Sequence, residues 1–408
     1  MQRRTFLKRL LVVGGAWVAA QRAGWLPSAL AQEQLFFVPP TVHHVSEDSA
    51  TLVFRLSLPT ANGLVRVFEG DQPVLELPYD ASATLWQQVV VPGPQASHTY
   101  RYQVEADGAV PLALMAGQPG MPWEGLSFRT QPHPFPLRVA AVGDSGFGHT
   151  ITRELGQVMA QQQPDFFIHL GDVVYWMHQY NGNAYLNWME KYFIPFQDVL
   201  ARGPHYATFG NHEQDGPAQL DGWPSYYWMF PPFNEDQNDF GARSWYSFDY
   251  NNIQFISLNS QLFYSYARFF APQQEWLLQK LQRDDVRYTV IFFHISPYNS
   301  ASLNQWDGLR IQEQWVPLFE SAPCKVALVM GGHAHIYERL LQNGIHYLVA
   351  GSGSDTIYGE GVPMENRVFF ARETCFPMLE FYEDRIALQT YTAAGAVIDQ
   401  AELPLRTF

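Results

Sequence analysis

The segment DFFIHLGDVVY, residues 165–175, reads as a buried strand that ends on a carboxylate and a phenol. Its apolar run starts at Phe166 and stops at Gly171, and Asp172 and Tyr175 follow directly beyond it. Taken alone, the segment also fits a turn whose Asp caps a helix while the Tyr packs on the core. A functional interpretation therefore depends on whether other segments bring ligand-type side chains to the same place.

Strand-like and helical patterns alternate through most of the chain after Leu137, which favours a layered α/β architecture. A hairpin over 246–260 is expected to turn at Asn251-Asn252, and 378–403 closes the chain with β-structure. The other strand-like segments are LRVAAVGD (137–144), HYATFGNHE (205–213), YTVIFFHISP (288–297), KVALVMGGH (325–333) and IHYLVAGSGS (345–354), and helical spacing is present in 150–163, 184–200, 271–284 and 309–322.

The region before this part has a different texture, with short alternating runs between Pro, Gly and Asn turns from about 38 to 130. This pattern predicts a small all-β sandwich domain, which we place at 32–131. The strand SHTYRYQVE resembles the corner strand of fibronectin type III domains, where a tyrosine pins the sandwich, and Tyr100 takes that place. The proline-rich stretch 131–136 is a plausible linker to a second domain over 137–408.

Residues 1–31 have the features of an export signal. A twin-arginine stretch at Arg3-Arg4 precedes a mild apolar segment, and Ala29-Leu30-Ala31 offers a small-x-small cleavage site. The apolar segment is too short to span a bilayer, and no Cys follows the cleavage site, so we expect no stable membrane anchor. The pattern predicts transport by the twin-arginine export machinery to the periplasm or the medium.

The charge balance excludes one class of partner. The whole chain has a formal net charge of −14, and removal of a leader with five basic residues and no acids gives −19 (−14 − 5). Such an acidic protein repels nucleic acid backbones and anionic membranes. An exported protein can form disulfides, but the sequence leaves open whether Cys324 and Cys375 pair.

Five separate predicted strands end in side chains that can bind a metal. Ligands of α/β sheets bind beyond the carboxyl ends of the strands, so these side chains are expected to meet. Two carboxylates, a phenol, an amide and three imidazoles suit iron, manganese or zinc, and they are too many for one tetrahedral zinc. The residues are Asp144, Asp172, Tyr175, Asn211, His294, His333 and His335.

The order GDSG, GDVVY, GNHE, a strand ending in His, and GHAHIYER resembles the calcineurin-like metallophosphoesterases. The Tyr of GDVVY and the HAHIYER ending narrow the resemblance to purple acid phosphatases over about 137–357, and the N-terminal sandwich is similar to that of larger members. The resemblance implies a catalytic domain built as a layered β-sandwich flanked by helices (αββα). It also implies a dinuclear metal centre that hydrolyses phosphate esters by direct in-line attack of a metal-activated water.

The resemblance also implies a role for each residue. Asp144, Asp172, Tyr175 and His335 would hold Fe³⁺, and a phenolate bound to Fe³⁺ gives the family its colour. Asp172, as a bridge, would hold a divalent ion (Fe, Zn or Mn) together with Asn211, His294 and His333. His212 would contact the phosphate and protonate the leaving oxygen, and Glu213 is interpreted as a structural acid. Tyr337 and Glu338 would support the metal ligands from outside.

The chain departs from plant members of the family in the loop after His294. Those members carry two adjacent histidines where this chain has Leu303-Asn304, so one proton donor is missing and the substrate preference is open. The main hypothesis is an exported acid phosphatase acting on small phosphate monoesters. The alternatives are a phosphodiesterase or nucleotidase on the same scaffold, and a non-catalytic binding protein. The sequence does not indicate the natural ester, the second metal or the oligomeric state.

Overall fold

The computed structural model describes residues 35–92, 95–113, 121–122, 125–176, 184–214, 244–265 and 267–406. The predicted export signal, 1–31, lies outside the described residues. No helix of the described part is long and apolar enough to cross a membrane.

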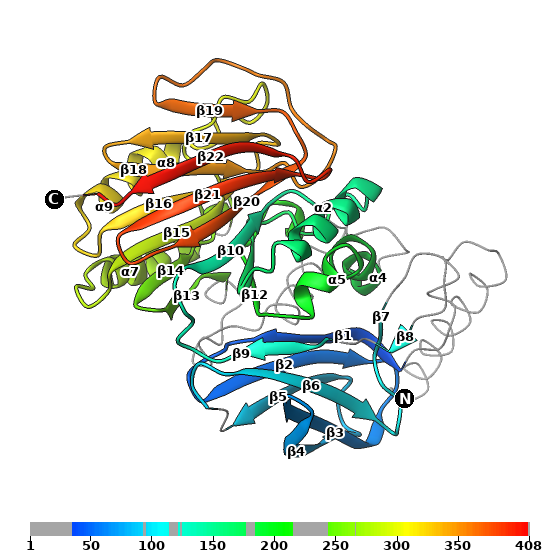
Figure 1. Cartoon of the computed structure of the whole chain (residues 1–408). Coiled ribbons are helices and arrows are strands. Elements are labelled where there is room, and N and C mark those ends of the chain that lie inside the picture. The colour runs from blue at the N-terminus through cyan, green and yellow to red at the C-terminus, as the bar shows by residue number, and fades with distance from the viewer. Residues whose placement is uncertain are drawn as a thin grey trace, which may run out of the picture.

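The N-terminal region folds into two antiparallel sheets that enclose one core (Figure 1). One sheet has the order β1-β2-β5 and the other the order β4-β3-β6-β9. Buried residues of both sheets form this core, among them Leu52, Phe54 and Phe128, which confirms the predicted all-β domain. The strands are β1 (Phe36–His43), β2 (Ser49–Leu56), β3 (Thr60–Glu69), β4 (Gln72–Ala81), β5 (Trp86–Pro92), β6 (Thr99–Ala106) and β9 (Ser127–Arg129), beside a short pair, β7 (Leu112–Ala113) and β8 (Met121–Pro122).

Tyr100 lies in this core, and the role expected for it from the fibronectin type III resemblance remains a prediction. Its ring is buried, and its hydroxyl accepts the backbone N–H of Gln95 at 2.6 Å. The connection to the next region is also fixed, because the His133 ring contacts Asp165 at 2.9 Å and Asn251 accepts the His133 N–H. The domain boundaries at 131 and 137 remain a prediction. They lie between the end of β9 and the start of β10.

The rest of the chain contains two larger sheets packed face to face, with Val139, Phe166, Phe255 and Val290 among the buried residues between them. The six-stranded sheet has the order β12-β11-β10-β20-β21-β22 and the seven-stranded sheet the order β13-β14-β15-β16-β18-β17-β19. Their strands are β10 (Leu137–Val142), β11 (Phe166–His169), β12 (His205–Ala207), β13 (Tyr246–Tyr250), β14 (Ile253–Ser257), β15 (Tyr288–Ile295), β16 (Val326–Gly332), β17 (Tyr337–Gln342), β18 (Ile345–Ala350), β19 (Arg367–Ala371), β20 (Cys375–Phe381), β21 (Arg385–Thr392) and β22 (Val397–Pro404).

Helices cover the outer faces of both sheets, which confirms the expected layered α/β architecture (Figure 1). On the six-stranded sheet, α2 (Thr150–Gln161) and α5 (Ile194–Leu200) pack over β10 and β11 through Leu155, Met159 and Phe196. On the seven-stranded sheet, α7 (Phe270–Leu281), α8 (Leu309–Gln314) and α9 (Val316–Ser321) bury Leu277, Trp315 and Phe319.

Two predicted helices are interrupted where proline occurs. The segment 184–200 forms α4 (Ala184–Trp188), a π-helical turn (Met189–Phe193) and α5, with Pro195 in the first turn of α5. The segment 309–322 divides into α8 and α9 next to Pro317. Proline lacks the N–H that a regular α-helix would use, so the hydrogen-bond pattern changes there. The backbone at Trp188, Phe193 and Trp315 nevertheless stays in the right-handed helical region. The predicted turn at Asn251-Asn252 is confirmed, with φ of 53° and 60° between β13 and β14.

The sandwich meets the six-stranded sheet at a seam between β1 and β12, where Val42 pairs with Pro204. At this seam His43 Nε2 lies 3.1 Å from His205 Nε2, and the hydroxyl of Tyr192 lies 2.7 Å from His205 Nδ1. We call His43, His205 and Tyr192 the seam cluster. All three side chains are buried, so the seam joins the two regions through polar groups that water does not reach.

Candidate metal centre

Six of the seven predicted ligands lie in loops at one edge of the two central sheets, and the seventh, His294, lies near the carboxyl end of β15. β10 pairs in parallel with β11, and β11 with β12. In the other sheet the parallel pairs are β14 with β15, β15 with β16, and β16 with β18, so the carboxyl ends of several strands lie at this edge. Three of the ligands, Asp144, Asp172 and His333, have left-handed backbones with φ of 59°, 52° and 67°. This conformation is uncommon outside glycine and turns each side chain sharply away from its strand.

Glycines in the same loops allow their close approach. A Cβ at Gly210 would collide with Asp172 Oδ1, and a Cβ at Gly332 would collide with Asp144 Oδ2. These contacts explain the glycines of the GN and GG motifs. A ligand from another loop occupies the space that a side chain at either position would need, so only glycine fits there.

One half of the site is built around Tyr175. Its hydroxyl donates to Asp144 Oδ1 at 3.2 Å and lies 3.0 Å from His335 Nε2. His335 Nε2 lies 3.4 Å from the same Asp144 oxygen, and His335 Nδ1 contacts the carbonyl of Thr356 at 2.7 Å. Tyr175, Asp144 and His335 thus converge on one small volume, as the sequence predicts.

The other half is built around His294. Its Nε2 lies 3.1 Å from Asn211 Oδ1 and 3.3 Å from Asp172 Oδ2, while its Nδ1 contacts the carbonyl of Leu170 at 2.8 Å. Ligand atoms of Asp172, His294 and His333 all lie within 4.8 Å of one another. The two halves meet, because His294 Nε2 is also 4.0 Å from Asp144 Oδ1.

The electrostatics of these residues fit a cation site. Asp144, Asp172 and His294 are fully or almost fully buried. Burial raises the pKa of the Asp172 carboxyl, but the facing His294 and His212 outweigh it, and the net pKa is lowered. Burial lowers the pKa of His294, but Asp172 and Asp144 outweigh it and raise that pKa to about 10. Buried carboxylates of this kind require a cation, which is either the imidazolium proton or a metal that displaces it.

The phenol behaves in the same way. Burial, with the neighbouring Asp172 and Asp144 charges, raises the pKa of Tyr175 well above its usual value. Ionisation of the phenol therefore requires a strongly positive partner at this position. The donor set of carboxylates, imidazoles, an amide oxygen and a phenol suits hard-to-borderline ions and fits a dinuclear metal centre.

Glu213 holds the loop that carries Asp172. Its carboxylate accepts backbone N–H groups from Asp172 (3.0 Å), Val173 (2.7 Å), Val174 (3.2 Å) and Gly210 (2.7 Å). Burial, and then the charge of Asp172, raises the pKa of Glu213 to about 7. These contacts agree with the interpretation of Glu213 as a structural acid.

His212 lies at the mouth of the same site. Its backbone N–H donates to Asp172 Oδ1 at 2.9 Å, and its Nε2 is 3.9 Å from Asp172 Oδ2. The imidazole packs against the ring of Tyr175 with centroids 4.1 Å apart, and 31% of the side chain is exposed. His212 is therefore a titratable group beside the buried ligands that solvent, and hence a substrate, can reach.

Tyr337 and Glu338 use other partners. The Tyr337 hydroxyl donates to Asp399 at 2.8 Å. Glu338 accepts the backbone N–H of Ser300 at 2.6 Å and the Ser300 hydroxyl. Any support that they give to the metal ligands is therefore indirect, through the β17 strand and the loop after His294.

Three contacts of the ligands were not anticipated from the sequence. Phe147 stacks on Tyr175 with centroids 3.9 Å apart, and Tyr358 stacks on His335 at 4.2 Å. Asp307 lies 2.9 Å from His333 Nε2 through its carboxylate. Phe147 closely follows the GDSG motif and was open to prediction, whereas Tyr358 and Asp307 lie in loops without a recognisable pattern.

The loop that lacks the plant-type histidines does lie against the site. Asn304 is half-buried, and its amide donates to the His333 carbonyl at 3.2 Å, whereas Leu303 is 56% exposed. Position 304 therefore borders a predicted ligand, while position 303 faces solvent.

Among the described residues, His169, His149 and the two cysteines have structural roles, whereas His178 lies outside the described residues. His169 contacts the Ser145 hydroxyl at 2.7 Å, and burial, followed by the charge of His294, lowers its pKa to about 3. His149 pairs with Asp355 at the surface. Cys324 and Cys375 are both buried free thiols, so the possible disulfide is not formed.

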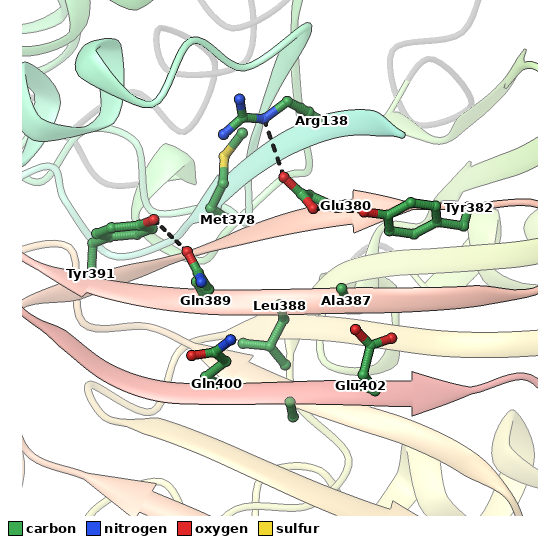
Figure 2. Close-up of a pocket in the computed structure, with 11 residues that line it drawn as sticks. Arg138, Met378, Glu380, Tyr382, Ala387, Leu388, Gln389, Tyr391, Gln400 and Glu402 are labelled. Carbon is green, nitrogen blue, oxygen red and sulfur yellow. Dashed lines mark hydrogen bonds and ion pairs between the residues drawn. The ribbon is translucent and has the colours of Figure 1, made fainter. Parts of the chain in front are cut away.

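A surface cavity of about 380 Å³ lies elsewhere, on the outer face of the six-stranded sheet (Figure 2). Its side chains come from β10, β20, β21 and β22, on the part of the sheet that α2 and α5 leave uncovered. They largely satisfy one another, with Arg138 facing Glu380 at 3.6 Å and Tyr391 bonded to Gln389 at 2.6 Å. None of the seven predicted ligands lines this cavity, so the metal centre is assigned to the loops described above.

Comparisons with known proteins relate the chain to phosphoesterases. Residues 137–337 match the family model described as calcineurin-like phosphoesterase. Purple acid phosphatase 18 of Arabidopsis thaliana is 28% identical over 230 residues, which are 53% of this chain and 48% of the relative. The chain spans about half the length of the first curated relatives that it matches.

Solved structures share the fold over most of the chain. Purple acid phosphatase PPD1 from yellow lupin (Lupinus luteus) seeds has a TM-score of 0.68 at 16% identity, covering 90% of this chain and 74% of its own. PhoD has a TM-score of 0.67 at 14% identity, covering 92% and 93%. Residues 137–337 are thus a calcineurin-like phosphoesterase domain. Within that class, this part of the chain is similar to purple acid phosphatases.

Proposed function

We propose that this protein is an exported phosphatase that hydrolyses small phosphate monoesters at a dinuclear metal centre. The observation that carries the proposal is the convergence of buried carboxylates, imidazoles and a phenol on one volume, with Asp172 and His294 3.3 Å apart. When bound, the two ions supply an activated nucleophile and stabilise the charge that develops on the phosphoryl oxygens. The likeness of the chain to purple acid phosphatases supports the same chemistry.

We assign the ligands as follows. Asp144, Asp172, Tyr175 and His335 hold Fe³⁺. Asp172, Asn211, His294 and His333 hold a divalent ion. The hydrogen bonds of Tyr175 to Asp144 and His335 and the contacts of His294 with Asn211 and Asp172 support this division.

His212 is assigned two tasks by its position. Its partly exposed imidazole lies over Tyr175 and near Asp172, so Nε2 is able to bind a phosphate oxygen and to donate its proton to the leaving oxygen. The backbone N–H of His212 orients Asp172, and Glu213 holds that loop in place. Asn304 supplies an amide where a second imidazole would otherwise assist, so leaving-group protonation falls mainly to His212.

The decisive experiment compares metal content with ester turnover in the purified protein. We expect two ions per chain and faster hydrolysis of p-nitrophenyl phosphate than of bis(p-nitrophenyl) phosphate. Faster turnover of the diester would replace the monoesterase by a phosphodiesterase on the same scaffold. Bound metal without turnover of any ester, nucleotides included, would favour a binding protein.

The export part of the proposal rests on the leader. The twin arginines at Arg3-Arg4 and the cleavage pattern at Ala29-Leu30-Ala31 predict processing after Ala31. The double variant Arg3→Lys, Arg4→Lys is expected to accumulate uncleaved in the cytoplasm, as followed by fractionation and mass spectrometry. Normal processing of the double variant would exclude the twin-arginine route.

A further inference from the structure

A carboxylate outside the predicted ligand set contacts a predicted ligand. Asp307 lies in the turn before α8, and its Oδ2 is 2.9 Å from His333 Nε2. The carboxylate of Asp307 is 48% exposed, whereas the imidazole of His333 is only 13% exposed. An Asp–His pair at the rim of the site therefore extends inward to a residue assigned to the divalent ion.

His333 is held at three points of its structure. Its backbone N–H donates to Asp144 Oδ2 at 2.8 Å, and its carbonyl accepts from Asn304 at 3.2 Å. The backbone between these contacts is left-handed, with φ of 67°, a conformation that is uncommon outside glycine but that histidine tolerates. The two backbone hydrogen bonds fix the position of the His333 backbone, and the contact with Asp307 fixes the orientation of its ring.

The contact with Asp307 also selects one tautomer of His333. A carboxylate can only accept a hydrogen bond, so the proton of a neutral imidazole resides on Nε2 and the lone pair on Nδ1. The nitrogen that remains for an ion is then Nδ1. A carboxylate on the far ring nitrogen also raises the basicity of the donor nitrogen and thereby strengthens metal binding.

Asp307 is itself held in position by its neighbours. Its carbonyl accepts the hydroxyl of Tyr264. The guanidinium of Arg310 lies 5.7 Å from the ring centroid of Tyr264 and donates to the carbonyl of Phe263 at 2.6 Å. The turn that presents the carboxylate is thus anchored to a separate segment of the chain, as a positioning residue requires.

We propose that Asp307 is a positioning residue for the divalent ion, acting through His333 by fixing its ring direction and its tautomer. The inference rests on the dinuclear centre of the proposed function and adds to it a residue that the ligand motifs do not contain. The chain offers a matched control: Asp355 pairs with His149 at the surface and is similarly exposed (57%), but His149 is not one of the ligands.

The test measures metal binding directly, without reference to turnover. The full-length purified protein is stripped with a chelator and titrated with Zn²⁺ in equilibrium dialysis. The wild type is expected to bind two ions. In Asp307→Ala one ion should stay tightly bound, while the affinity for the second falls about 10- to 100-fold, the range for loss of an outer partner of a metal ligand.

Two further variants separate positioning from general damage. Asp307→Asn keeps an oxygen that accepts the Nε2 proton but loses the charge, so its affinity for the second Zn²⁺ should lie between those of Ala and the wild type. Asp355→Ala should bind both ions as the wild type does. Where turnover is present, excess Zn²⁺ should restore it in Asp307→Ala, which a loss of fold would not allow.

The outcomes distinguish this inference from the proposed function. Unchanged binding of the second Zn²⁺ by Asp307→Ala overturns the inference and leaves the phosphatase intact, and so does an equal loss of both ions. Two bound ions without ester turnover in the wild type overturn the phosphatase, while weaker binding of the second ion in the variant still supports Asp307. A wild type with no second ion overturns both.

Discussion

Two buried clusters of histidine and tyrosine in this molecule use similar contacts for different ends. At the metal centre the hydroxyl of Tyr175 lies 3.0 Å from His335, and at the seam the hydroxyl of Tyr192 lies 2.7 Å from His205. Both pairs are buried and well packed. What separates them is the presence of carboxylates: Asp144 and Asp172 face the first cluster, whereas the seam histidine His43 faces His205.

The carboxylates determine what each cluster does with protons. Beside Asp172 and Asp144 the pKa of His294 rises to about 10 although burial opposes it. At the seam burial lowers the pKa of His205 to about 3, and burial with the charge of His205 places that of His43 well below its usual value. The metal centre attracts cations, while the seam histidines stay neutral and act as hydrogen-bonding core residues.

The largest effect is expected when one histidine in each cluster is replaced by asparagine. His294→Asn should lose the divalent ion and at least about a hundredfold in kcat/KM, since even outer partners of metal ligands contribute 10- to 100-fold. His205→Asn should keep its kcat/KM but unfold more easily, because buried polar groups at the seam lose their partners at about 1–3 kcal/mol each. Steady-state kinetics and urea titrations give both values. Equal loss of activity in the two variants would contradict the division of roles.

The two tyrosines sharpen the same contrast through colour. If Tyr175 binds Fe³⁺ as phenolate, Tyr175→Phe should lose the visible absorption band while circular dichroism shows the fold intact. Tyr192→Phe should keep the band and lose about 1 kcal/mol of stability with its hydrogen bond to His205. A colourless wild type holding only zinc or manganese would remove the iron assignment and leave the metallophosphoesterase assignment in place.

Acid should weaken the seam by a predictable amount. The folded-state pKa of His205 lies near 3, below the ordinary value of 6.5, so between these values the unfolded chain binds a proton that the folded chain does not. Stability from this group is therefore complete above about pH 6.5 and is lost as the pH falls. From pH 7 to pH 5 the loss is about 2 kcal/mol for His205.

Urea titrations at the two pH values check this loss, with His205→Leu as the control. The leucine variant cannot titrate at this position, so its unfolding free energy should depend less steeply on pH than that of the wild type. Equal slopes for the two proteins would mean that the seam histidine is protonated in the folded state or does not contribute to acid sensitivity.

The two clusters also differ in how far the sequence predicts them. Every predicted metal ligand lies at or just beyond the carboxyl end of a strand of the α/β pattern, and short motifs such as GDVVY and GNHE mark these positions. The convergence of Asp172 with His294 was therefore predictable from order alone. The seam was not, because His43 and His205 belong to regions far apart in the chain, and no spacing rule states which faces of two domains will dock. The same limit applies to Asp307, whose partner His333 lies in a different loop, directly after β16.

Local helix geometry shows a similar limit. Helical spacing over 184–200 predicted a helix, which is confirmed, but it did not predict the π-helical turn over Met189–Phe193. The apolar pattern of the sequence indicates which face of a helix is buried. It does not reveal the one extra residue that makes a turn π-helical. The layers themselves, in contrast, follow from the alternation of strands and helices and were predicted correctly.

The smallest effect concerns the proton that the leaving group needs, and it depends on the loop at Asn304. The amide of Asn304 borders His333 but cannot donate a proton at a useful pKa, so His212 works largely alone. A general acid typically contributes about 10²- to 10⁴-fold, and mainly for basic leaving groups. Nitrophenolate leaves without help and an alkoxide does not, so kcat/KM should fall steeply from aryl to alkyl phosphates.

Asn304→His should raise alkyl turnover more than aryl turnover, by up to about tenfold, well below the full contribution of an acid whose position has been optimised. The backbone there has φ of 61°, which histidine tolerates, although the hydrogen bond to the His333 carbonyl is lost. Leu303→His is the control, because position 303 is exposed and its imidazole should change neither substrate class. The measurement is kcat/KM over esters of graded leaving-group pKa in the three proteins. A flat dependence in the wild type, with chemistry rate-limiting, would mean that another acid already serves the site and that the missing histidine has been replaced.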